Sequence, residues 1–102
     1  LIRAEARAEL GTDLSGALDD LNAIRGRAGV PLSTDASQAG LLLQIENERR
    51  VEFAVEPFRW YDLARTGRAV TVLNIPDYKL LFPIPATEIS LNPNLAQNPG
   101  YE

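Results

Sequence analysis

Residues 14–28 read LSGALDDLNAIRGRA, and their apolar side chains recur at intervals of three and four positions. The apolar positions are Leu14, Ala17, Leu18, Leu21, Ile24 and Ala28. This spacing predicts an α-helix with one continuous apolar stripe. Thr12 or Asp13 is a suitable N-cap, and Gly29 followed by Pro31 is typical of the end of a helix.

Helical patterns also lie on either side of this stretch. Residues 1–10 are rich in Ala, Glu, Arg and Leu, and Gly11 ends the pattern, so an antiparallel helix pair is expected. A second long helix is predicted over 37–55. Pro57 interrupts it and is expected to begin a further helix that ends near Thr66 and Gly67. Residues 68–78 fit either the end of a helix or an extended segment.

The C-terminal tail has a different character. Residues 79–85 read KLLFPIP, and the two prolines predict an extended backbone, whereas residues 86–91 can form one helical turn. We expect the tail to cross the helices and to place Leu81, Phe82 and Ile84 on them. The predicted fold is therefore mainly α-helical with an extended, proline-rich tail, arranged as a single domain over residues 1–102.

The composition excludes several classes of function. Hydrophobic residues make up 45% of the 102 positions, and a net charge of −4 argues against both a nucleic-acid partner and a basic membrane-surface segment. Cysteine and histidine are both absent, which removes thiolate and imidazole catalysis and metal ligation by these groups. No catalytic, cofactor-binding or metal-binding residue is therefore predicted. Since Leu1 already lies within a helical pattern, we expect the chain to be part of a longer protein.

Eight charged residues in the central part of the chain form a predicted structural ion-pair network. They are Glu48, Arg49, Arg50, Glu52, Glu56, Arg59, Asp62 and Arg65. The glutamates recur every four positions and should share one face of a helix. Glycoside cleavage would need carboxylates facing each other across a sugar, so ion pairing is the preferred interpretation. Our hypothesis is that Arg59 and Asp62 bridge to the row formed by Glu48 and Glu52.

Apolar and aromatic side chains are also interpreted as structural. Trp60 and Tyr61 could stack on sugar rings, but an aromatic pair within a helical pattern is more typical of a core or an interface. Tyr78 and Tyr101 are equally plausible contacts, and no residue is named as ligand-binding. The apolar stripe within residues 14–28 is expected to be buried, and any part left exposed would favour a homodimer.

Three sequence blocks, in order, resemble the SusD/RagB family. The first is LIRAEA at 1–6 with LNAIRGRAG at 21–29. The second is ERRVEFAVE at 48–56 with RWYDLAR at 59–65. The third is LFPIP at 81–85 with NPNL at 92–95 and QNPGY at 97–101. One departure is Pro57, where the family commonly has glycine, so a different turn angle is expected there.

This resemblance implies tetratricopeptide-like helical hairpins and the C-terminal region of a lipid-anchored protein on the outer face of the outer membrane. Members of the family capture glycans or other nutrients for a TonB-dependent transporter and are not enzymes. The resemblance implies that most ligand contacts come from parts of the protein outside this chain, which would act as helical scaffold. The alternative is a free-standing tetratricopeptide-like module that binds proteins, in which the LFPIP block and its Asn-Pro turns would have no role.

Overall fold

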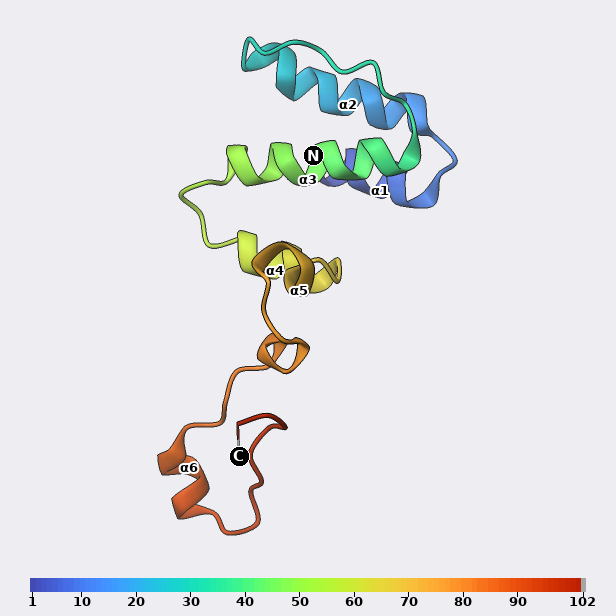
Figure 1. The fold of residues 1–102 in the computed structure, drawn as a ribbon. Helices are drawn as coiled ribbons and strands as arrows, with labels where there is room; N and C mark the ends of the chain where they lie inside the picture. The colour runs from blue at the N-terminus through green and yellow to red at the C-terminus, as the bar shows by residue number, and fades with distance from the viewer. Residues whose placement is uncertain (102) are drawn as a thin grey trace. The chain divides into compact units, whose positions relative to one another are not determined.

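The computed structural model describes residues 1–101, and its regular structure is helical, with no strand in that range (Figure 1). The elements are α1 (Ile2–Leu10), α2 (Leu14–Arg27), α3 (Gln38–Glu52), α4 (Arg59–Arg65), α5 (Ala69–Leu73), the 3₁₀-helix η1 (Asp77–Leu80) and α6 (Ala86–Leu91). The predicted mainly α-helical class is therefore confirmed. No helix in the described range is long and apolar enough to span a membrane.

The chain divides into two compact units, Leu1–Glu56 and the residues from Pro57 onward. The first unit contains α1, α2 and α3, which pack against one another (Figure 1). Its buried core consists of Ala4, Ala8, Ala17, Leu21, Leu41 and Ile45. Three of these side chains are alanines, which allow the helices to approach closely. The single-domain organisation predicted from the sequence stays a prediction.

Local signals set the limits of the first two helices. Gly11 ends α1 with a left-handed backbone (φ 68°), which glycine adopts without steric cost. Asp13 caps α2 by accepting a hydrogen bond from the backbone N–H of Gly16 at 2.9 Å. The predictions for these boundaries, with Asp13 as one of two suitable caps, are confirmed.

The boundary between α3 and α4 differs from the prediction. α3 ends at Glu52, three residues before the expected Val55, and α4 begins at Arg59 rather than Pro57. An α-helix continuing through this region would need an N–H at position 57 to bond the carbonyl of Phe53, and proline has none. That carbonyl instead accepts from the N–H of Glu56 at 3.0 Å, so the intervening residues form turns.

The second unit consists of short helices and an extended segment. Leu63 and Ala69 are buried within it. The ambiguous residues 68–78 contain the short helix α5, which is followed by Asn74 with a left-handed backbone, and the start of η1. After η1, Leu81 and Pro85 have extended backbones, and α6 provides the expected short helix. The predicted crossing of the tail over the helices stays a prediction.

Candidate functional site

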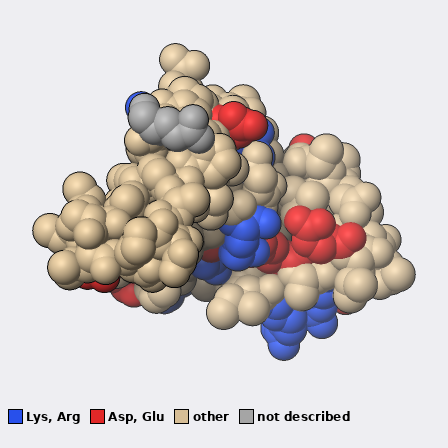
Figure 2. Space-filling model, turned by 90° about the horizontal axis from the view of Figure 1, so that it is seen from below, with Lys and Arg blue, Asp and Glu red and all other residues tan. Residues whose placement is uncertain are grey.

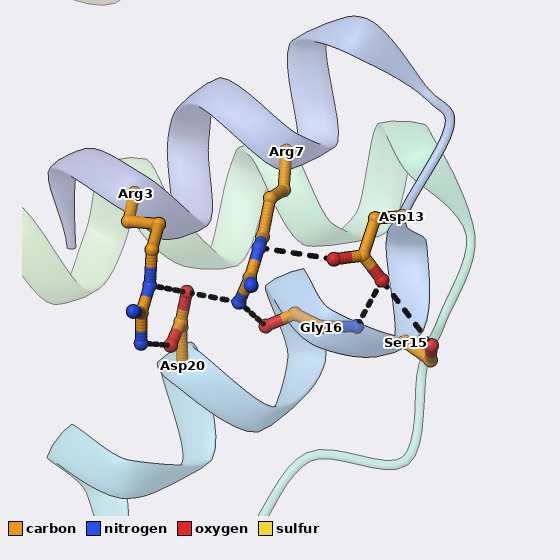
Figure 3. Close-up of polar contacts among 6 residues, drawn as sticks. All are labelled: Arg3, Arg7, Asp13, Ser15, Gly16 and Asp20. Carbon is orange, nitrogen blue, oxygen red and sulfur yellow. Dashed lines mark hydrogen bonds and ion pairs between the residues drawn. The ribbon is translucent and has the colours of Figure 1, made fainter.

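Two arginines of α1 surround one carboxylate of α2 (Figure 3). Arg3 binds Asp20 through two nitrogens, with its Nε 2.9 Å from Oδ2 and its Nη2 2.6 Å from Oδ1. Arg7 donates from Nη1 to Asp20 Oδ2 at 2.8 Å and to the carbonyl of Gly16 at 3.1 Å. The Nε of Arg7 lies 3.0 Å from Asp13 Oδ2, so the helix cap belongs to the same cluster.

The electrostatics of this cluster centre on Asp20, whose side chain is 13% exposed. The hydrogen bond from Arg3 lowers the pKa of Asp20 below its ordinary value, and the charges of Arg3 and Arg7 act in the same direction. The hydrogen bond to Asp20 in turn raises the pKa of Arg3. Both residues are therefore held in their charged forms, and the cluster fastens α1 to α2.

A second set of ion pairs joins α3 to its neighbours. Arg25 donates from Nη1 to Glu48 Oε2 at 2.8 Å and from Nε to the carbonyl of Pro31 at 2.8 Å. Arg27 of α2 pairs with Glu52. Glu48 is the buried charged residue of the first unit, and its guanidinium partner offsets the loss of hydration.

The remaining residues of the predicted network lie in several environments. The Nε of Arg49 lies 4.0 Å from Oε2 of Glu5, and the Cζ of Arg49 lies over the ring of Phe53, 5.1 Å from the ring centroid. Arg50 is exposed and has no ion-pair partner within the first unit. Asp62 pairs with Arg65 three positions later, at 2.8 Å.

The predicted grouping of the three glutamates needs correction, because Glu56 lies beyond the end of α3 and is exposed. Glu48 and Glu52 do lie on one helix, and the partners observed for them are Arg25 and Arg27. The predicted bridges from Arg59 and Asp62 to these glutamates would join the two units and stay a prediction.

The ion-pair network predicted from the sequence did not include Arg3, Arg7, Asp20, Arg25 or Arg27. The four-residue spacing of Arg3 and Arg7 could have indicated a shared face.

The extended segment of the second unit is held by three polar side chains near the C-terminus. We call residues 81–85 the strap and Gln97, Asn98 and Tyr101 the clamp. Gln97 accepts from the N–H of Ile84 at 2.8 Å and donates to the carbonyl of the same residue at 2.9 Å. The other two clamp side chains donate to strap carbonyls, Asn98 to Phe82 at 2.7 Å and Tyr101 to Leu81 at 3.0 Å. The clamp thus takes the place of a neighbouring β-strand.

Aromatic contacts support the strap and the clamp. The rings of Trp60 and Phe82 are 5.8 Å apart between centroids, and Tyr78 meets Tyr101 edge-on at 5.2 Å. Gly100 lies against Tyr78 with φ at 86°, and a Cβ there would be 2.5 Å from the ring. Glycine is therefore required at this position for both backbone conformation and space.

The clamp gives a direct prediction. Gln97→Ala should expose the backbone amide and carbonyl of Ile84 to solvent, and we expect hydrogen exchange at the Ile84 amide to accelerate by at least about tenfold. Trp60 is the single tryptophan of the chain, so its fluorescence reports whether Phe82 stays in place. Gln44→Ala, on α3 in the other unit, is the control and should leave both signals unchanged. Equal exchange rates in the two variants would contradict the assigned role of Gln97.

These arrangements are suited to holding helices and loops in place. Within residues 1–101, no cluster of three or more Asp or Glu residues has a geometry that could hold a metal ion. Buried side-chain nitrogen and oxygen atoms in that range all have hydrogen-bond partners. Acidic and basic side chains are both present on the face shown in Figure 2. The ion pairs of the first unit join its helices to one another.

Comparison with known proteins places these features in a wider setting. A sequence profile described as the SusD family matches residues 1–79 and 68–101. The chain is 31% identical over 114 residues to SusD-like protein P38 of Formosa agariphila, covering 99% of this chain and 22% of that protein. It is also 31% identical to the starch-binding protein SusD of Bacteroides thetaiotaomicron, covering 100% of this chain and 20% of that protein. The chain thus spans about a fifth of these relatives, and no solved structure matches it significantly.

Proposed function

This chain belongs to the SusD family, and on that premise we propose that it forms the C-terminal helical scaffold of a protein that captures glycans or other nutrients. In this proposal the protein is lipid-anchored at the external face of the outer membrane and delivers its ligand to a TonB-dependent transporter. Ligand contacts come mainly from parts of the protein outside these residues. The protein binds its ligand without chemically changing it.

The observation that carries the proposal is that the sequence blocks resembling the family make structural contacts within the fold. The blocks at 1–6 and 21–29 contribute to α1 and α2, which the arginine–aspartate cluster fastens together. In the block at 48–56, Glu48 and Glu52 are paired with arginines of α2. The blocks at 81–85 and 97–101 are the strap and its clamp. Residues of the blocks that resemble the family therefore make contacts that stabilise the fold, which supports a scaffold role.

A glycan is the favoured ligand class because one relative, at 31% identity, is described as starch-binding. A carboxylate pair for glycoside cleavage would need two acids open to a sugar. Glu48 and Glu52, two of the three glutamates considered for that chemistry, are each bound to an arginine. This pairing supports binding without catalysis.

The proposal can be tested by deleting the gene in the source bacterium and measuring growth on single purified glycans. We expect slower growth on one class of glycan and normal growth on its constituent monosaccharide, since uptake of the polymer would be lost. The protein tagged at its C-terminus should be found in the outer-membrane fraction together with a TonB-dependent transporter. A cytoplasmic protein without a glycan-specific growth defect would instead favour the protein-interaction module.

The scaffold part of the proposal has a separate test. Calorimetric titration of the 102-residue chain with malto-oligosaccharides, and with oligosaccharides of the class identified by growth, should give no measurable heat of binding. Saturable binding to this chain would contradict the scaffold role, even if the growth experiment supported a role in glycan capture.

A further inference from the structure

Helix α1 is apolar on two opposite faces. Its inner face carries Ala4 and Ala8, both fully buried in the core of the first unit. Ile2, Ala6 and Leu10 recur every four positions and lie on the other side, where Ile2 is 79% and Leu10 is 74% exposed and Ala6 is also exposed. We call these three residues the outer stripe. At 100° per residue the stripe is centred roughly opposite the buried alanines.

A helix that is apolar on two faces is typically buried on both. Ile2 and Leu10 lie one helical turn before and after Ala6, and both side chains are more than seven-tenths exposed. Together the three residues form a ridge that is lower at its centre. Such a surface suits ridge-into-groove packing against another helix, because the small central residue allows close approach of the axes. A nine-residue helix is also marginal on its own and gains stability from a second packed face.

We infer that the outer stripe of α1 is the packing surface for an amphipathic α-helix of the same protein that lies outside these 102 residues. Two relatives of the family are about five times as long as the chain, so most of a family member lies beyond the part seen here. In helical-hairpin arrays each pair of helices contacts its neighbours and is incomplete without them. The inference depends on family membership and does not depend on which nutrient is captured.

Charges at the edges of the stripe define the chemistry of the partner helix. Arg3 and Arg7 lie along one edge and are already paired with Asp20. Glu9 lies along the other edge, seven positions after Ile2, and is exposed with no ion-pair partner within the first unit. The partner helix should therefore present an aliphatic stripe with a lysine or arginine at the edge that faces Glu9.

The absence of cysteine from the chain allows a direct test by thiol labelling. Ala6→Cys places a thiol at the centre of the outer stripe, and Asp19→Cys places one at an exposed position of α2 as the matched control. Each variant is made both in the 102-residue chain and in the protein expressed from its native gene. The rate of reaction with a maleimide reporter is measured after circular dichroism confirms folding.

We expect both cysteines to react rapidly in the 102-residue chain. In the protein from the native gene, the thiol of the Ala6→Cys variant should react at least about tenfold more slowly than in the 102-residue chain. This slower rate should not depend on the protein concentration. The thiol of the Asp19→Cys variant should react at the same rate in both proteins. Equal rates at position 6 in the two proteins would overturn the inference. Protection that disappears on dilution would also overturn it, because the stripe would then be covered by a second copy of the protein.

Discussion

Leu21→Ala is expected to lower the free energy of unfolding of the first unit by about 2–5 kcal/mol. Leu21 is fully buried in the core where α1, α2 and α3 meet. Three of the other five core residues are alanines, whose short side chains cannot extend into the space that the substitution leaves. The loss of buried apolar surface and the cavity therefore both contribute to the destabilisation.

The size of the unit makes this loss decisive. A core formed by so few side chains supplies only about 3–5 kcal/mol of net stability. We therefore expect the variant to be largely unfolded in its first unit at room temperature. Far-UV circular dichroism should show the loss of the long helices α2 and α3, and the fluorescence of Trp60 reports on the second unit.

Leu43→Ala is the matched control, because it removes the same atoms from a leucine of α3 that is 51% exposed. Its urea midpoint should stay close to that of the unaltered protein, since surface substitutions usually change stability by no more than about 0.5 kcal/mol. If Leu21→Ala and Leu43→Ala shifted the midpoint equally, the assignment of Leu21 to the core would be wrong.

The sequence was sufficient to predict those features of the fold that depend on neighbouring residues. The apolar spacing of residues 14–28 and the glycines at 11 and 29 locate α2 because helix propensity, capping and termination are local effects. The extended strap follows from its proline positions in the same way. The end of α3 was misplaced because hydrophobic pattern continues past Glu52, although the turns before Pro57 stop the helix there.

The partners within the candidate site could not be predicted in the same way. The spacing of Glu48 and Glu52 shows that they share a face, but it does not show which helix packs against that face. The packing of α3 beside α2 brings Arg25 and Arg27 to them. Similarly, the contact of Gln97 with Ile84 depends on a chain reversal and has no periodic signal in the sequence. Ion-pair and clamp partners are properties of tertiary packing.

Asp20→Asn is expected to lower the free energy of unfolding by about 2 kcal/mol at neutral pH, which is typical for loss of hydrogen bonds to a charged group. The asparagine keeps the shape of the side chain but removes the charge that holds both Arg3 and Arg7. Its amide nitrogen also replaces an acceptor with a donor, facing a guanidinium that can only donate. Asp19→Asn, at an exposed neighbouring position of α2, is the matched control and should change stability little.

The pH dependence of the stability difference between the unaltered protein and Asp20→Asn tests whether the charge of Asp20 is its cause. Arginine contacts lower the pKa of Asp20 in the folded protein, so its stabilising contribution is present above the ordinary carboxyl pKa of about 4. Below that pH the unfolded chain takes up the proton first, and the contribution is lost as the pH falls through the lowered folded-state pKa. The free energy of unfolding is measured by denaturation at a series of pH values from 7 to 2. The difference in this free energy between the unaltered protein and Asp20→Asn should be constant above about pH 5 and should shrink as the pH falls further. A gap of the same size at pH 2 and pH 7 would mean that packing, rather than the charge of Asp20, fastens α1 to α2.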